Sequence, residues 1–394
     1  MSVVKLIIWG IPLLSIAWWI WADRRLGKMS LRRGWRATLA GAMLLLLAGF
    51  TWVILARHDV VTIPIPKIIY SLVLLWGLIF LPFLGIPSML SWALWSIFWR
   101  FFSRKTEFIK FPESAGEKKW TRRKWLGTTL SVLPVLGTYG ATAFSLPMVS
   151  RFRIREMTVS LKDLPPELDG MSIAHITDTH VGKFTRGKVL DAIVAATNRL
   201  QVDLVLFTGD LIDNSIGDLP EAVRMLQRFQ AKSGVFVVEG NHDLFDDPVE
   251  FERGLRAGGI NLLRNEIAQV KVRGALLEIL GIVWNRTEKA MARDVDTVAA
   301  FRSPDAFPIL LAHHPHAFDR AAEHGIPLTL AGHTHGGQLM LTNHVGPGPS
   351  MFRYWSGLYQ KSGLAMIVGN GTGNWFPVRV NAPAEIIYLT LRCG

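Results

Sequence analysis

Five short polar clusters follow one another in the second half of this sequence, each directly after a short and largely apolar run. The clusters are Asp178-Thr179-His180, Gly209-Asp210, Gly240-Asn241-His242-Asp243, His313-His314-Pro315 and Gly332-His333-Thr334-His335. A short apolar run of this kind is typical of a buried strand, and neighbouring strands can end at the same edge of a sheet. Carboxylate, imidazole and amide groups that converge on one edge predict a metal site.

The chemistry that such a site favours is hydrolysis of a phosphate ester between two divalent cations about 3.5–4 Å apart. One carboxylate must then bridge both cations, and Asp210 is the expected bridge because Gly209 before it lets the backbone approach closely. Asn241 offers a neutral amide oxygen that would hold a cation without repelling the phosphate. Two pairs of side chains lie two residues apart at a strand end and could point to the same side: Asp178 with His180, and His333 with His335.

Cysteine usage narrows the kind of metal site. The sequence contains a single cysteine, Cys393, so it can form neither an intrachain disulfide nor a thiolate metal site. Ligands drawn from His, Asp and Asn suit manganese, iron, zinc or cobalt. We therefore expect two divalent metal ions as cofactors, with manganese as the first candidate.

Charge is divided unevenly along the 394 residues. Residues 1–150 carry 18 Lys and Arg against 5 Asp and Glu, whereas residues 151–394 carry 25 against 26. A nucleic-acid-binding protein would place its excess positive charge on the folded domain, and this chain does not. No nucleic-acid partner is expected, and the change in composition near residue 150 predicts two domains, 1–150 and 151–394.

Four apolar stretches in residues 1–150 approach or exceed the length of about 20 residues that crosses a bilayer. They cover residues 6–22, 38–56, 68–99 and 126–146, and no charged residue interrupts them. A charge at mid-helix costs about 2.5–3.5 kcal/mol on insertion scales, so its absence disfavours the alternative of buried helices in a soluble domain. Residues 1–150 are therefore predicted to anchor the protein in a membrane.

Two basic segments indicate the orientation in that membrane. Residues 23–36 hold six Lys and Arg and residues 100–124 hold nine, and both are expected on the cytoplasmic side. Four crossings, with residues 68–99 as one kinked helix, satisfy both segments. Five crossings, with a break at residues 85–87, would leave the first basic segment outside, so four is preferred. Residues 151–394 are then expected on the extracytoplasmic side.

Strand-like runs alternate with helical patterns in residues 151–394. The helical patterns cover 188–200, 219–231, 248–257, 288–301 and 317–324, and further strand-like stretches lie at 266–272, 276–282, 365–368 and 385–391. This mixture of alternation and hairpins predicts an α/β domain in which helices flank a pair of mixed sheets.

The order D-x-H, G-D, G-N-H-D, a later His and G-H-x-H resembles the calcineurin-like metallophosphoesterase family over residues 150–392, and five separate motifs must coincide for it to occur. The family implies a four-layer α/β/β/α sandwich with a dinuclear metal centre at the strand ends. Carried over by position, it implies one metal held by Asp178, His180, Asp210 and His335. It implies a second metal held by Asp210, Asn241, His313 and His333.

The resemblance also implies two catalytic residues that bind no metal. His242 would donate to the leaving group or to a phosphate oxygen, and Asp243 would orient it. In the crowded fourth cluster, the family pattern Leu-x-His-x-Pro selects His313 as the ligand. The period of two along a strand then places His314 on the opposite face.

Within the family, the sequence is most similar to the membrane-anchored branch of YkuE-like and YaeI-like bacterial proteins. The similarity rests on residues 164–170, 332–338 and 376–379. Where that branch is expected to have Ser-Arg-Gly-x-Gly, this chain has Gly369-Asn370-Gly371-Thr372-Gly373, which lacks the arginine that would touch substrate phosphate. Arg379 is predicted either to replace it in part or to form a surface salt bridge.

The combined expectation is a membrane-anchored phosphohydrolase that cleaves a phosphodiester, pyrophosphate or phosphomonoester bond. Its substrate would be lipid-linked or a phosphorylated envelope molecule, because a soluble substrate gives little reason to hold the site beside a bilayer. The resemblance suggests UDP-2,3-diacylglucosamine of lipid A synthesis as one candidate. That substrate is made in the cytoplasm, which conflicts with the predicted orientation.

Two other classes of protein fit parts of this sequence. A catalytically silent membrane sensor or scaffold that retains the fold is the main alternative, and the complete set of motif residues disfavours it. A transporter with a regulatory phosphoesterase domain is disfavoured because the predicted spans carry no Asp, Glu, Lys, Arg or His.

Overall fold

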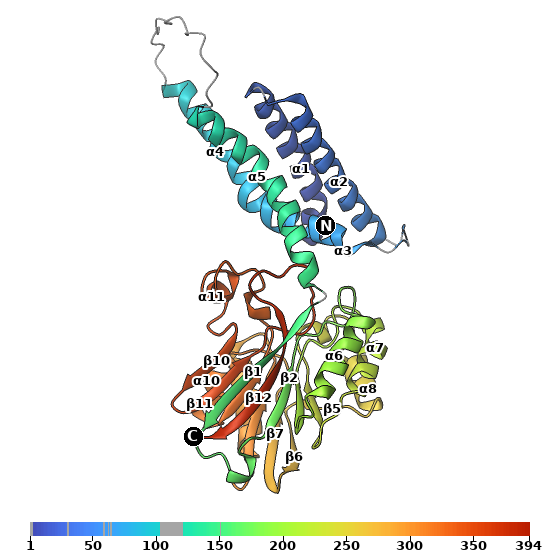
Figure 1. Ribbon diagram of the computed structural model, residues 1–394, viewed down its shortest axis with the longest axis vertical. Helices are drawn as coiled ribbons and strands as arrows, with labels where there is room; N and C mark the ends of the chain where they lie inside the picture. The colour runs from blue at the N-terminus through green and yellow to red at the C-terminus, as the bar shows by residue number, and fades with distance from the viewer. Residues whose placement is uncertain are drawn as a thin grey trace, which may run out of the picture. The chain divides into compact units, whose positions relative to one another are not determined.

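The structure, a computed structural model, describes residues 3–29, 31–57, 60–61, 63, 65–102, 121–149 and 151–394. Contacts between Cα atoms divide the chain into two compact units, Met1–Leu146 and Pro147–Gly394. The first unit is helical, and the second contains all the described strands (Figure 1). They are called the helical unit and the α/β unit below.

The helical unit is built from long apolar helices. Its elements are α1 (Val3–Lys28), α2 (Arg33–Arg57), α3 (Lys67–Leu75), the π-helical segment η1 (Trp76–Gly85), α4 (Ile86–Phe102) and α5 (Arg122–Ser145). The elements α3, η1 and α4 follow one another without a gap, with Pro82 inside η1. Proline lacks a backbone N–H, and a π segment is one way in which a helix continues past such an interruption. The five-crossing alternative requires a break at residues 85–87, and the helix has none there.

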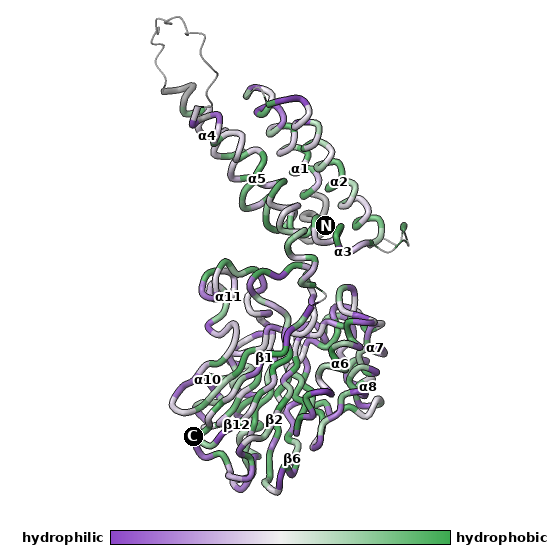
Figure 2. Tube along the Cα trace, viewed as in Figure 1, coloured by the Kyte–Doolittle hydropathy of each residue, from purple (hydrophilic) through white to green (hydrophobic). Residues whose placement is uncertain are grey.

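Three described stretches are long and apolar enough to span a membrane: Arg33–Ala56, Lys67–Phe98 and Lys124–Met148. They coincide with three of the four predicted spans. The remaining one, residues 6–22, lies in α1, and the side chains of residues 3–9 are outside the description. Most of the predicted basic segment 100–124 also lies outside the described residues. Figure 2 shows hydrophobic residues along the helices and hydrophilic ones at the turn between α1 and α2.

Two six-stranded sheets form the centre of the α/β unit. The first has the order β1 (Phe152–Leu161), β12 (Ala384–Cys393), β2 (Ser172–Ile176), β3 (Leu204–Thr208), β4 (Val235–Val238) and β5 (Asn261–Leu262). The second has the order β10 (Gly357–Lys361), β11 (Leu364–Val368), β9 (Leu328–Ala331), β8 (Phe307–Leu311), β7 (Ala275–Gly281) and β6 (Glu266–Val272). Strands β2, β3 and β4 are parallel to one another, as are β7, β8 and β9.

The sheets pack face to face and helices cover their outer faces (Figure 1). The central core joins residues of both sheets, such as Leu204 and Leu206 of β3 with Ile309 and Leu311 of β8. The first sheet is covered by α6 (Lys188–Arg199), α7 (Leu219–Leu226) and α8 (Pro248–Ala257). The second is covered by α9 (Glu288–Ala300) and α10 (Ala317–Glu323), and α11 (Pro347–Met351) lies in the long loop before β10. These layers confirm the predicted α/β/β/α fold.

The topology explains how the five polar clusters meet. Each cluster begins within three residues of the end of a strand, namely β2, β3, β4, β8 or β9. Parallel strands direct their carboxyl ends to the same edge of a sheet. Because the two sheets are packed together, both contribute loops to one site.

Candidate metal centre

The backbone of the candidate site has an unusual conformation. Five residues of the predicted ligand set have positive φ angles: Asp178 (50°), His180 (46°), Asp210 (54°), His333 (72°) and His335 (49°). Left-handed backbone at a residue other than glycine costs of order 1–3 kcal/mol and persists where the surrounding structure enforces it. Five left-handed residues within one predicted ligand set indicate that the fold accepts a local loss of stability to direct these side chains towards one site.

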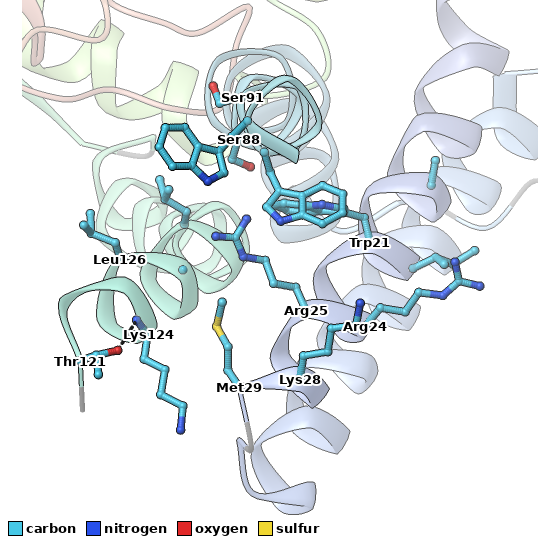
Figure 3. Close-up of a pocket in the computed structure, with 16 residues that line it drawn as sticks. Trp21, Arg24, Arg25, Lys28, Met29, Ser88, Ser91, Thr121, Lys124 and Leu126 are labelled. Carbon is cyan, nitrogen blue, oxygen red and sulfur yellow. Dashed lines mark hydrogen bonds between the residues drawn. The ribbon is translucent and has the colours of Figure 1, made fainter. Parts of the chain in front are cut away.

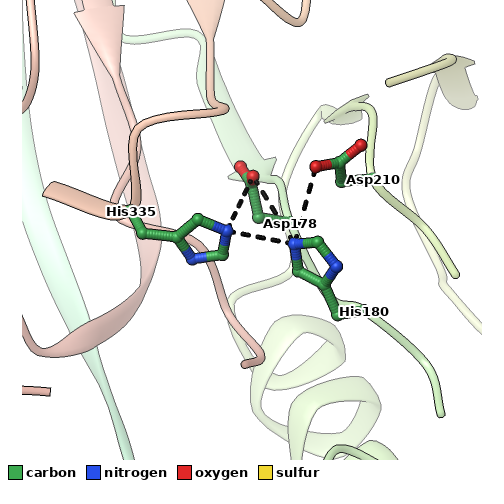
Figure 4. A group of neighbouring side chains, drawn as sticks. All are labelled: Asp178, His180, Asp210 and His335. Carbon is green, nitrogen blue, oxygen red and sulfur yellow. Dashed lines mark hydrogen bonds and ion pairs between the residues drawn. The ribbon is translucent and has the colours of Figure 1, made fainter. Parts of the chain in front are cut away.

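One group that could hold a metal ion consists of Asp178, His180, Asp210 and His335 (Figure 4). Nε2 of His335 lies 3.2 Å from Oδ1 of Asp178 and 3.0 Å from Nε2 of His180. Nε2 of His180 lies 3.5 Å from Oδ2 of Asp210. The Asp178 carboxylate is oriented by the backbone N–H of His333, which donates to it at 3.0 and 3.1 Å.

A second group contains Asp210, His313 and His333. Nε2 of His313 lies 3.2 Å from Oδ2 of Asp210 and 3.3 Å from Nδ1 of His333. The other ring nitrogen of His313 donates to the carbonyl of Thr208 at 2.7 Å, which leaves Nε2 to face the site. Metal-binding histidines are commonly held in this way by a backbone carbonyl.

The two groups meet at one oxygen atom. Oδ2 of Asp210 faces both His180 and His313, whereas Oδ1 accepts a hydrogen bond from the backbone N–H of His242 at 2.8 Å. Asn241 directly precedes His242 in the sequence. Its side-chain oxygen is buried and has no hydrogen-bond partner among the described residues. A buried oxygen without a donor is costly unless a cation binds it. The donor set therefore fits two divalent cations.

Ionisation of the histidines agrees with this fit. Burial lowers the pKa of His333 and of His335 well below the usual value, and the neutral imidazole is the form that binds a metal. Burial also lowers the pKa of His313, but the charges of Asp210 and Asp178, with the hydrogen bonds to Asp210 and to the Thr208 carbonyl, together outweigh it and raise that pKa to about 9. The proton on His313 compensates the buried carboxylate, and metal binding would release it.

Comparison with known proteins decides the family. The family profile described as calcineurin-like phosphoesterase matches residues 171–337. A metallophosphoesterase of Helicobacter pylori is 32% identical over 300 residues, which cover 74% of this chain and 76% of that protein. The chain belongs to the calcineurin-like metallophosphoesterase family. It is a metal-dependent phosphoesterase, a hydrolase, and the family implies divalent metal ions as cofactors.

Two further relatives confirm the predicted branch of the family. The Bacillus subtilis metallophosphoesterase YkuE is 28% identical over 290 residues, which cover 70% of this chain and 99% of YkuE. A Danio rerio protein named transmembrane protein with metallophosphoesterase domain is 31% identical over 279 residues, which cover 67% of this chain and 62% of that protein. This metallophosphoesterase is therefore similar to YkuE and to relatives named as transmembrane proteins.

His242 of this metallophosphoesterase lies beside the two ligand groups, with its ring centroid 4.5 Å from that of His180. Its Nδ1 donates to the backbone carbonyl of Asp213 at 2.5 Å. The Asp243 carboxylate instead accepts from the backbone N–H groups of Ile212 and Gly240, at 3.0 and 2.8 Å. The expectation that Asp243 orients His242 directly is therefore corrected, because Asp243 instead ties together the loops that follow β3 and β4.

Sequence reasoning did not find Asp213. Besides holding His242 through its carbonyl, it places Oδ1 3.6 Å from Nδ1 of His180 and 3.6 Å from Nδ1 of His242. The three residues form a third group of potential ligand atoms within 4.8 Å of one another. The signal in the sequence was a second aspartate three residues after Asp210.

Arg379 of the metallophosphoesterase is fully buried, which corrects both roles predicted for it. Nη1 donates to the carbonyls of Asn370 and Ala382 at 2.8 and 2.9 Å, and Nη2 donates to that of Gly373 at 2.6 Å. Nη2 also lies 3.1 Å from Nδ1 of His335. Arg379 thus supports the loop behind a ligand group and neither faces substrate nor forms a surface salt bridge. Burial lowers its pKa to about 10.

Gly332 provides a test of how tightly the site is packed. A Cβ atom at this position would overlap the Thr177 hydroxyl and the Asp178 carboxylate. Gly332→Ala is expected to displace Asp178 and to lower kcat/KM by about 100-fold, since a misplacement of about 1 Å can cost that much. Steady-state hydrolysis of bis-p-nitrophenyl phosphate measures the loss. Gly217→Ala, where the added atom meets only Ser215 Oγ at 3.3 Å, is the matched control and should retain activity.

Proposed function

We propose that this protein is a membrane-anchored, dinuclear phosphohydrolase that cleaves a phosphodiester, pyrophosphate or phosphomonoester bond in a lipid-linked or envelope substrate. The observation that supports it most directly is Oδ2 of Asp210, which lies 3.5 Å from His180 and 3.2 Å from His313. One carboxylate oxygen shared by two imidazole-containing groups is what a two-metal phosphoesterase requires.

In this proposal each cation has four protein ligands. The first is held by Asp178, His180, Asp210 and His335, and the second by Asp210, Asn241, His313 and His333. Manganese is the proposed metal, and iron, zinc or cobalt would suit the same ligands. The chemistry that two bound cations supply is neutralisation of phosphate charge and a lowered pKa for the attacking water.

His242 is proposed to move a proton at the leaving group. Because its Nδ1 donates to the Asp213 carbonyl, Nε2 is the ring nitrogen that remains to exchange a proton with the leaving oxygen. The ring is held on one side by the Asp213 carbonyl and on another by the ring of Phe245, with centroids 4.5 Å apart. A fixed imidazole beside the ligand groups suits general acid catalysis.

Aromatic side chains around the site support a lipid-linked substrate. Phe245, Trp284, Phe352 and Trp375, called the aromatic rim here, each place a ring 4.5–6.1 Å from that of His242 or His333. Phe245 is 55% exposed and Trp375 is 42% exposed. Exposed aromatic rings beside a polar site favour a ligand with an apolar part.

The loop that carries Trp375 is tied to the start of the α/β unit. The side chain of Asn374 donates to the carbonyl of Val149 at 2.9 Å. The chain therefore enters the α/β unit beside the loop that carries one residue of the aromatic rim.

Trp375→Ala tests the lipid-linked substrate class. Hydrolysis of a phosphorylated lipid in vesicles is expected to fall about tenfold, since burial of a large apolar side chain is worth about 1.5 kcal/mol or more. Hydrolysis of soluble bis-p-nitrophenyl phosphate should change less than twofold. Phe301→Ala removes a more exposed aromatic ring, 78% exposed, at the end of α9 and serves as control. An equal loss on both substrates would count against a lipid-binding rim.

The single cysteine allows the membrane side to be tested. Cys393 is exposed in the α/β unit, and the proposed topology places it outside the cytoplasm. A membrane-impermeant maleimide should therefore label it in intact cells, and Cys393→Ser should abolish the label. Labelling only after lysis would place the unit in the cytoplasm. It would overturn the proposed orientation and make UDP-2,3-diacylglucosamine the first substrate to assay.

A further inference from the structure

A cavity of about 990 Å³ in the helical unit lies among α1, α4 and α5 (Figure 3). Four basic side chains line it: Arg24, Arg25 and Lys28 of α1, and Lys124 of α5. No acidic side chain is among its lining residues. In Figure 3, Arg25 and Met29 extend from the end of α1 towards α5. A cavity of this charge and size would hold an anionic ligand comparable to a small lipid headgroup with part of its chains.

Asp23, the acidic residue that the structure describes in the helical unit, does not pair with the basic side chains of the cavity. Asp23 is the only Asp or Glu in the described part of residues 1–146, and both its carboxylate oxygens accept from Arg36, at 2.6 and 2.9 Å. Arg36 does not line the cavity. The positive charge of Arg24, Lys28 and Lys124 thus lacks an acidic partner among the described residues, and an anionic ligand would complement it.

The lining changes from basic to apolar along the helices. On α1, residues 17, 20, 21, 24, 25 and 28 line the cavity and lie on one helical face, with the basic positions in the last two turns. On α5, Lys124 near the beginning of the helix is followed by Leu126 and Leu130. The cavity therefore has a charged end and an apolar end, as a phospholipid does.

Two tryptophans occupy the junction between these ends. The guanidinium carbon of Arg25 lies 5.4 Å from the ring centroid of Trp21, and the rings of Trp21 and Trp92 are 6.2 Å apart. The buried indole N–H of Trp21 has no acceptor among the described residues. Tryptophan prefers the interface between headgroups and acyl chains, where a lipid oxygen could accept from it.

We propose that this cavity binds an anionic phospholipid of the bilayer, with its phosphate between the α1 and α5 cations and an acyl chain along Trp92 and Leu130. Basic pockets between membrane helices recognise such headgroups. The inference does not depend on the reaction at the metal centre or on which side of the membrane that centre lies.

The test uses the full-length protein in detergent, titrated with phosphatidylglycerol and followed by native mass spectrometry. Arg24→Ala with Lys28→Ala is expected to weaken binding about 30-fold, since each basic residue near an anionic headgroup contributes about 1 kcal/mol. Arg32→Ala with Arg33→Ala removes the same charge from exposed positions outside the cavity and should change binding less than threefold. Equal losses in the two double variants would overturn the proposal.

Two further arms separate a lipid from a free phosphate. Ser91→Trp fills the apolar part of the cavity and leaves all four cations in place, so it should also weaken phosphatidylglycerol binding by about tenfold. Unchanged lipid binding in this variant would overturn the acyl-chain assignment. Phosphatidylcholine should bind at least tenfold more weakly than phosphatidylglycerol, and inorganic phosphate should not compete at millimolar concentration. Full competition by phosphate, or equal binding of both lipids, would contradict an anionic-lipid site.

Discussion

Asp210→Ala is expected to lower kcat/KM for bis-p-nitrophenyl phosphate by about 10⁴-fold, equivalent to about 5.4 kcal/mol of transition-state stabilisation. The reason is that Oδ2 of Asp210 is the atom common to both ligand groups, so its removal weakens both cation sites at once. The same variant also loses the acceptor that fixes the backbone N–H of His242. Metal content should fall below one ion per chain, measured by inductively coupled plasma mass spectrometry.

Asp210→Asn provides the isosteric control for this variant. It retains the side-chain volume and an oxygen that can accept from the His242 backbone, but it removes the negative charge. We expect it to behave like the alanine variant in metal content and activity. If Asp210→Asn kept two metal ions and near-normal activity, a bridging carboxylate would not be needed, and the ligand assignment would be wrong.

His242→Ala is expected to lower kcat by about 10² to 10⁴-fold, the usual contribution of a positioned general acid or base. Its metal content should remain unchanged, because His242 is proposed to move a proton rather than to bind a cation. The loss should be smaller for a substrate whose leaving group needs no proton, such as a p-nitrophenyl ester, than for an alkyl phosphodiester. Steady-state kinetics on both substrates, with metal analysis of the same samples, measures these effects.

His344→Ala is the matched control, because His344 is exposed and belongs to none of the candidate ligand groups. It should retain both activity and metal. Loss of metal in His242→Ala would contradict the role assigned to His242 and move it into a ligand group. His242 lies close enough to Asp213 and His180 to hold a metal ion together with them. The metal analysis therefore decides between a proton-transfer role and a ligand role for His242.

The convergence of the candidate ligand residues could be predicted from the sequence because it depends on local rules. Apolar runs that end in Asp178 or His333 indicate strand ends, and parallel strands bring their ends together. The sequence also predicted a close approach of the backbone at Gly209. In the structure, a Cβ atom there would lie 2.6 Å from Nδ1 of His313. The two-sheet architecture followed from the same alternation.

The support around those ligands could not be predicted, because it depends on long-range or backbone contacts. Asp213 holds His242 through its carbonyl, a group that every residue carries, so no residue type marks the role. Arg379 reaches His335 from 44 residues away, in a loop whose path only the folded structure defines. The charge of Arg379 suggested that it contacts phosphate or solvent. The residue is fully buried instead, and its role is structural.

The helical unit shows the same division between composition and geometry. Uninterrupted apolar runs predicted four spans, and three of them coincide with described helices that are long and apolar enough to cross a membrane. The basic residues 24, 25 and 28 predicted a cytoplasmic helix end, but their grouping with Lys124 around a cavity required the packing of α1 beside α5. Sequence patterns place such charges along a helix, and tertiary packing decides which of them share a binding site.

The most direct test of the central claim is a count of metal ions against activity in the full-length protein. After chelation, the protein would be titrated with manganese while bound metal and hydrolysis of bis-p-nitrophenyl phosphate are measured together. We predict that activity is lost on chelation and is restored as occupancy approaches two ions per chain. Full activity at one ion per chain, or no activity with manganese, iron, zinc or cobalt at full occupancy, would contradict a dinuclear phosphohydrolase.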